Sequence, residues 1–251
     1  MGGRCFKKII LLITGCFLLL AIASVQARCL LADKYKKEGN EELENLALVS
    51  CAMHYNDDES QLKIAEAYLK GTQGFEKNEL DALYMYQLAA ETGNAEAQVK
   101  LAELLQSFDT SPERRRMLKE YQGKLKKESS IEGGFSGEIL HPYTLLLLAS
   151  ERVENKWYYP SPNKAAPARA SVLLNGYQIS PEKKVAATKD ASRWKTRKLM
   201  ETAKEVFPEE EYLNFSKRLK DNTMRVEAMD EFKKKYTEYV DKKKKEREIP
   251  L

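Results

Sequence analysis

Apolar and small side chains recur along this chain at steps of three and four residues, which is the spacing of an amphipathic helix. No segment shows the alternation of β-branched and polar residues that is typical of a strand. The pattern predicts helices over about residues 41–54, 59–70, 79–92, 95–107, 112–127 and 142–153. From Pro181 onward it predicts long charged helices, the last of them beginning near Pro208. The sequence therefore predicts an all-α protein.

The chain repeats itself at a spacing of 37 residues. A shift of this length superimposes residues 61–66 on residues 98–103. It also superimposes apolar or small residues that precede each block: Leu43 and Leu80, Leu46 and Leu83, and Ala52 and Ala89. Alanine lets neighbouring helices approach closely, while larger apolar side chains fill the space between them. The repetition therefore predicts a stack of antiparallel helix pairs.

Residues 65–105, AEAYLKGTQGFEKNELDALYMYQLAAETGNAEAQVKLAELL, resemble the Sel-one-like repeat family, a branch of the tetratricopeptide-like superfamily. The resemblance rests on AEAYLKG, on Gly71, Gly74 and Phe75 in the following loop, on DALYMYQLAAETGN, and on the AEAQ that opens the next repeat. The resemblance is clear over residues 62–105 and degenerate elsewhere, with a weaker similarity from Ala170 onward. It implies an α-solenoid that binds another protein.

We expect five segments along the chain. They are a signal peptide (1–27), a helical repeat domain (28–127), an irregular segment with a short helix (128–167), a degenerate repeat and helix (168–206) and C-terminal charged helices (207–251). In the last segment Met229, Phe232, Tyr236 and Tyr239 form a short apolar seam. This seam is expected to dock on the body of the protein or on another helix.

The first 27 residues have the layout of a cleavable secretory signal. Basic residues precede an apolar run over residues 9–23, and Val25-Gln26-Ala27 supplies the small residues of a cleavage site. We expect cleavage after Ala27 and a periplasmic or secreted mature protein. Two alternatives stay open: residues 9–25 are about long enough to remain as a membrane anchor, and residues 13–16 are similar to a lipoprotein box that would be acylated at Cys16. Membrane association is expected only in these two cases.

The charge balance argues against a nucleic-acid partner. The signal holds three of the 42 basic residues, so its removal leaves 39 Lys and Arg against 38 Asp and Glu. A nearly neutral chain lacks the basic surface by which most proteins bind nucleic acid.

The mature chain has two cysteines, Cys29 and Cys51, which lie at equal distances in sequence from a predicted turn at Asn40. An antiparallel helix pair would place them side by side, and exported proteins meet an oxidising environment. We therefore expect a disulfide between them. Two separate buried thiols are the alternative.

Residues for catalysis or metal binding are sparse. The two histidines, His54 and His141, have no further ligand residue at a metal-binding spacing. No local motif provides an activated nucleophile, a phosphate-binding loop or a calcium loop. We therefore expect no enzyme, no cofactor and no metal.

The expected function is that of a protein-binding scaffold or adaptor in the bacterial envelope. Stacked repeats place equivalent positions side by side, so the polar residues of the two matched helices should share one concave face. The residues expected there are Lys63, Glu66, Lys70, Lys100, Glu103 and Ser107. The aromatic loop of Trp157, Tyr158 and Tyr159 either covers a seam between helical blocks or contributes to partner binding. A secreted factor acting on host or competitor proteins, or an enzyme inhibitor, is the alternative function.

Overall fold

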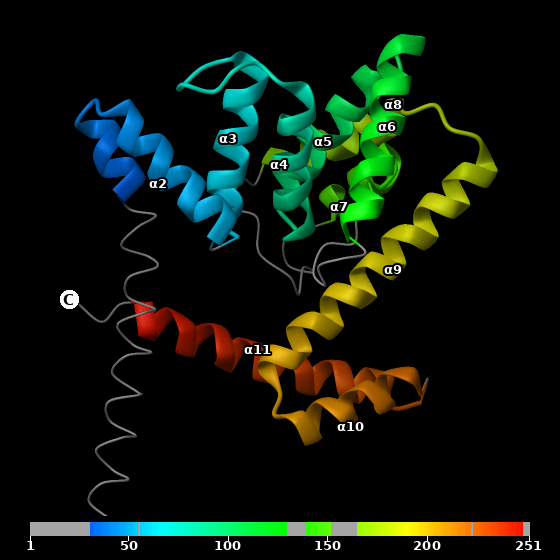
Figure 1. Ribbon diagram of the computed structural model, residues 1–251. Helices are drawn as coiled ribbons and strands as arrows, with labels where there is room; N and C mark the ends of the chain where they lie inside the picture. The colour runs from blue at the N-terminus through cyan, green and yellow to red at the C-terminus, as the bar shows by residue number, and fades with distance from the viewer. Residues whose placement is uncertain (1–30, 55, 130–138, 152–164, 222, 248–251) are drawn as a thin grey trace, which may run out of the picture. The chain divides into compact units, whose positions relative to one another are not determined.

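A computed structural model describes residues 31–54, 56–129, 139–151, 165–221 and 223–247 (Figure 1). All regular elements among these residues are helices, so the all-α prediction is confirmed. Besides helical residues 31–37, they are α2 (Glu41–His54), α3 (Asp58–Lys70), α4 (Glu79–Glu91), α5 (Ala95–Phe108), α6 (Pro112–Ser129), α7 (Pro142–Ser150), α8 (Ala165–Gly176), α9 (Pro181–Val206), α10 (Glu209–Lys220) and α11 (Arg225–Arg247).

The helices belong to two compact units, each with its own core. Helices up to α8 form the first unit, and α9, α10 and α11 form the second. The division follows Tyr177. Helices α8 and α9, which the sequence groups in one degenerate repeat, therefore fall in different units.

Local sequence explains where the repeat helices begin and end. Asp57 caps α3 by accepting a hydrogen bond from the Ser60 N–H, and Asn94 caps α5 by accepting one from the Ala97 N–H. Helix α3 ends at Lys70 and is followed by Gly71, whose φ of 66° lies in the left-handed region that glycine adopts most readily. These local signals account for the close agreement between the predicted and observed bounds.

The first unit is a succession of packed helix pairs. Residues 31–37 precede α2, α3 pairs with α4, and α5 packs next against α4. The contacts between these helices are lined by fully buried alanines: Ala65, Ala82, Ala89, Ala95, Ala97 and Ala102. Larger residues such as Leu83 and Leu101 fill the remaining space. The packing of small against large side chains agrees with the repeat pattern in the sequence.

Helix α7, and not α6, completes the pair that α5 begins. Helix α5 packs extensively on α7, which in turn contacts α8, whereas α6 touches α5 only marginally. Buried Tyr143, Leu146 and Ala149 of α7 follow the buried positions 83, 86 and 89 of α4 by a constant 60 residues. Helix α7 is apolar on most of its surface, while α6 is mainly charged, so burial favours α7 at this position.

The register of α2 differs from the one that the 37-residue shift predicts. The Gln61 Nε2 donates to the Ala52 carbonyl, and Gln98 donates in the same way to Ala90. Glutamines 37 residues apart thus bind carbonyls 38 residues apart, since Gln61 follows Ala52 by nine residues and Gln98 follows Ala90 by eight. Consequently Leu46 is not equivalent to Leu83: it is 66% exposed, whereas Leu83 is fully buried.

The second unit is held together by an aromatic core. Phe232 of α11 is fully buried and stacks on Phe215 and Tyr236, with Phe207 close by. The predicted apolar seam therefore docks on helices of its own unit. The last helix begins at Arg225 and not near Pro208, because Asp221 accepts hydrogen bonds from the Thr223 N–H and hydroxyl and ends α10.

Candidate protein-binding face

A line of ion pairs connects the first helices of successive pairs: residues 31–37, α3, α5 and α8. The Asp33 carboxylate lies 3.5 Å from the Lys63 ammonium, Glu66 lies 3.8 Å from Lys100, and Glu103 lies 2.5 Å from Arg169. Each carboxylate thus pairs with a basic residue on the next first helix. We call these six residues the ionic ladder.

The ladder follows a simple rule of spacing. On α3 and α5 the basic residue comes first, and three positions later comes a glutamate that pairs with a basic residue of the next first helix. These glutamates are Glu66 and Glu103, whereas the position three residues after Arg169 on α8 is Val172, which is 71% exposed. Within the described part of the chain the ladder therefore ends at Arg169.

Four of the six residues expected on the concave face belong to the ladder. Lys70 adjoins it, because its ammonium lies 3.3 Å from the Glu66 carboxylate on the same helix. Ser107 is directed elsewhere: its hydroxyl donates to the Leu104 carbonyl and accepts a hydrogen bond from Arg114, which also pairs with Glu79. The structure thus brings Lys63, Glu66, Lys70, Lys100 and Glu103 together and separates Ser107 from them.

Sequence reasoning missed the two ends of the ladder, Asp33 and Arg169. Neither residue lies in the clearly matched repeat. The basic-to-acidic spacing shared by residues 63–66 and 100–103 was the available signal. It does not extend to Arg169, because the third residue after Arg169 is Val172 and not an acidic residue.

A buried tyrosine of α4 lies within the influence of the ladder carboxylates. Tyr86 is almost completely buried. Burial first, and then the charges of Glu66, Glu96 and Glu103, raise the pKa of Tyr86 well above its ordinary value. The phenol therefore remains a neutral hydroxyl, and the ladder acquires no further negative charge from it at physiological pH.

The three ion pairs of the ladder are weak and accessible to solvent. Their side chains are between 30% and 60% exposed. Exposed pairs of this kind contribute about 0.2–1 kcal/mol each. Their charges can therefore exchange partners at little cost to the stability of the fold.

A second polar connection joins the starts of α3 and α5. The Asp58 carboxylate is buried and accepts a 2.7 Å hydrogen bond from the Asn94 amide. Burial raises the pKa of Asp58, and the hydrogen bond from Asn94 opposes that shift. Because Asn94 also caps α5, this contact fixes one helix start against the other and has a structural role.

Several predicted residues lie outside the described part of the chain. These are Trp157, Tyr158 and Tyr159 of the aromatic loop, Cys29, and the whole predicted signal. Cys51 is fully buried in α2 and is not a free thiol. The bond between Cys29 and Cys51 and cleavage after Ala27 therefore stay predictions.

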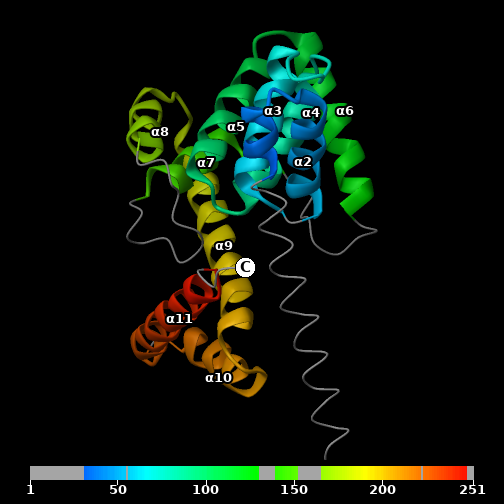
Figure 2. The same ribbon diagram turned by 90° about the vertical axis from the view of Figure 1, so that its left-hand side faces the viewer.

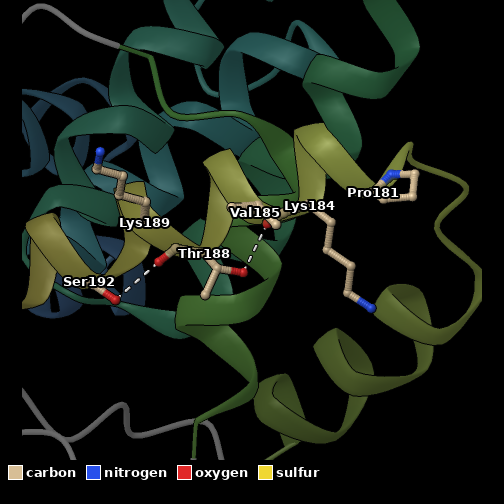
Figure 3. Close-up of a pocket in the computed structure, with 6 residues that line it drawn as sticks. All are labelled: Pro181, Lys184, Val185, Thr188, Lys189 and Ser192. Carbon is tan, nitrogen blue, oxygen red and sulfur yellow. Dashed lines mark hydrogen bonds between the residues drawn. The ribbon is translucent and has the colours of Figure 1, made fainter.

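One pocket of the second unit is lined by described residues of a single helix, α9 (Figure 3). Two of them carry hydroxyls: Thr188 donates to the Lys184 carbonyl and Ser192 donates to the Thr188 carbonyl. Both hydroxyls are thus bound to their own helix, and neither is next to an activating base among the lining residues. The pocket offers no evident chemistry.

Among the described residues, no three His, Cys, Asp or Glu side chains are grouped in a way that would hold a metal ion. None of their helices combines the length and the apolar character needed to cross a bilayer.

Comparison with known proteins reveals one partial similarity. A stretch of 76 residues, 30% of this chain, is 38% identical to part of Chitin synthase regulatory factor 1 from Schizosaccharomyces pombe. The matched part covers 17% of that protein, so the similarity extends over a small portion of it. No protein-family model matches the chain, and no solved structure matches it. The similarity is to a protein whose name describes a regulator.

Proposed function

We propose that this protein is an exported scaffold or adaptor that binds another protein of the bacterial envelope through the ionic ladder. The observation that supports this most is the continuity of the ladder over three ion pairs and four helices. Side chains far apart in sequence thereby present alternating charges on one accessible face.

The energetics of the ladder suit reversible binding. Each ion pair of the ladder contributes little to folding. A partner segment with alternating acidic and basic residues can therefore replace these internal ion pairs with ion pairs between its own side chains and those of the ladder. Such exchange favours specificity, since a partner of the wrong charge pattern meets like charges.

The binding proposal is tested by the double substitution Lys63→Glu and Lys100→Glu. It places like charges opposite Asp33 and Glu66, so we expect capture of the partner to fall by about tenfold or more, which is 1.4 kcal/mol or more in binding. The thermal unfolding midpoint should change little, because exposed charges contribute little to folding. Quantitative pull-down from envelope extract, with calorimetry of both proteins, measures both effects.

A matched control reverses two exposed lysines of α11, Lys233→Glu and Lys234→Glu. This variant should capture the partner as the unmodified chain does. If instead it loses the partner while the ladder variant keeps it, binding belongs to the second unit. A partner found only outside the producing cell would favour the alternative of a secreted factor acting on host or competitor proteins.

Export has its own test. We expect the isolated protein to begin at Arg28 and to carry a disulfide between Cys29 and Cys51, which would stabilise the terminal helix pair by about 3 kcal/mol. N-terminal sequencing and peptide mass spectrometry without reductant check both features. A chain that retains Met1, one that begins at an acylated Cys16, or alkylation of both thiols would contradict the proposal.

A further inference from the structure

Helix α2 carries an apolar stripe on its outward face. The stripe consists of Leu43, Leu46, Val49 and Met53, all of which are exposed. Spacings of three, three and four residues place them on one side of the helix. Leu48, Cys51 and Ala52, which are buried in the first unit, lie on the opposite side. The stripe is thus unused by the packing of α2 on its own unit.

The corresponding side of α4 has a different character. With the register of 38 residues, the stripe corresponds to positions 81, 84, 87 and 91, which are Asp, Tyr, Gln and Glu. Helix α4, which has packed helices on both sides, is therefore polar or amphipathic at the positions where α2 is apolar. The stripe is a property of α2 and is not a requirement of the repeat.

The position of α2 makes this apolar surface unusual. Among the described helices of the first unit, α2 lies toward one end of the row (Figure 1), and Figure 2 views the molecule from that side. Terminal repeats normally carry a polar outer face, which keeps the array soluble and prevents further stacking. A row of four large apolar residues there indicates a surface that is covered in the working protein.

We propose that a second copy of this chain covers the stripe, with the two α2 helices packed antiparallel about a two-fold axis. Such an axis makes one patch complementary to itself. It sets Leu43 of one copy near Met53 of the partner subunit, with Leu46 and Val49 near the centre.

The charges at the two ends of α2 fit this orientation. Glu42 is exposed in the first turn and His54 is exposed in the last. In an antiparallel pair each Glu42 carboxylate faces the His54 imidazole of the partner subunit, which can donate a hydrogen bond or form an ion pair. In a parallel pair, like residues would meet at both ends. The charge pattern therefore selects the antiparallel arrangement.

The oligomeric state of the full chain tests this proposal. Sedimentation velocity over a concentration series should show a reversible dimer. Leu46→Glu should leave only monomer, because it places a charge at the centre of the apolar contact, while the helix itself remains folded since Leu46 is exposed. Leu213→Glu, at a similarly exposed leucine of α10, should leave the dimer unchanged.

A charge exchange tests the orientation. Glu42→Lys and His54→Glu should each weaken the dimer several-fold, and the two changes together should restore it, because each copy then offers Lys opposite Glu. A monomeric unmodified chain at every concentration would overturn the proposal, as expected if residues 1–30 or a different protein cover the stripe. Dimerisation of the Leu46→Glu variant, or a double variant without restoration, would overturn it equally.

Discussion

Replacing Leu146 with alanine is expected to lower the free energy of unfolding of the first unit by about 2–5 kcal/mol. Leu146 lies in α7 and is fully buried in the core that α7 shares with α5 and α8. The substitution removes apolar contacts and leaves a cavity that closely packed helices cannot fill. Chemical denaturation followed by circular dichroism measures the loss.

Leu118→Ala in α6 is the matched control. Leu118 only adjoins the core and remains partly exposed, so its truncation should cost about 1 kcal/mol. The comparison decides which helix completes the pair that α5 begins. If the Leu118 variant is destabilised as strongly as the Leu146 variant, α6 contributes to the array as much as α7 does, contrary to the packing described above.

Phe232→Ala is expected to destabilise the second unit by about 3–5 kcal/mol. Phe232 is fully buried, and its ring packs against Phe207, Phe215 and Tyr236. Since this core includes no residue of the first unit, differential scanning calorimetry should show one transition moving to lower temperature and the other unchanged.

The control for this variant is Val226→Ala, at an apolar residue of the same helix that is 69% exposed. It should leave both transitions within experimental error, because little apolar surface is buried there. A Phe232 variant that shifts both transitions together would mean that the two units unfold as one cooperative body.

The sequence predicts that most residues of the ladder share one face. It does not predict which residue pairs with which. Lys63 and Lys100, like Glu66 and Glu103, occupy equivalent places in adjacent repeats, and stacking alone puts them on one face. The ion pair between Glu103 and Arg169 joins residues separated by the whole of α6 and α7. No local rule specifies that pair, because it depends on α8 packing directly beside α5.

The bounds of the repeat helices were determined by the sequence itself. Glu41, Glu79 and Ala95 begin helices where expected, because caps such as Asn78 and Asn94 and the spacing of apolar residues act within a few positions of one another. These effects are local and are not altered by the rest of the molecule.

Which helices pack together was decided only by the tertiary structure. The sequence predicts helices at α6 and α7 alike, and the choice between them as the partner of α5 depends on apolar surface summed over the whole contact. The register of α2 depends in the same way on one additional residue between Ala52 and Gln61, compared with Ala90 and Gln98, to which the 37-residue pattern is insensitive. The stabilisation gained by burying apolar surface is summed over many residues that are distant in the chain. Which of two helices packs against a third is therefore decided by the tertiary contacts and not by local sequence.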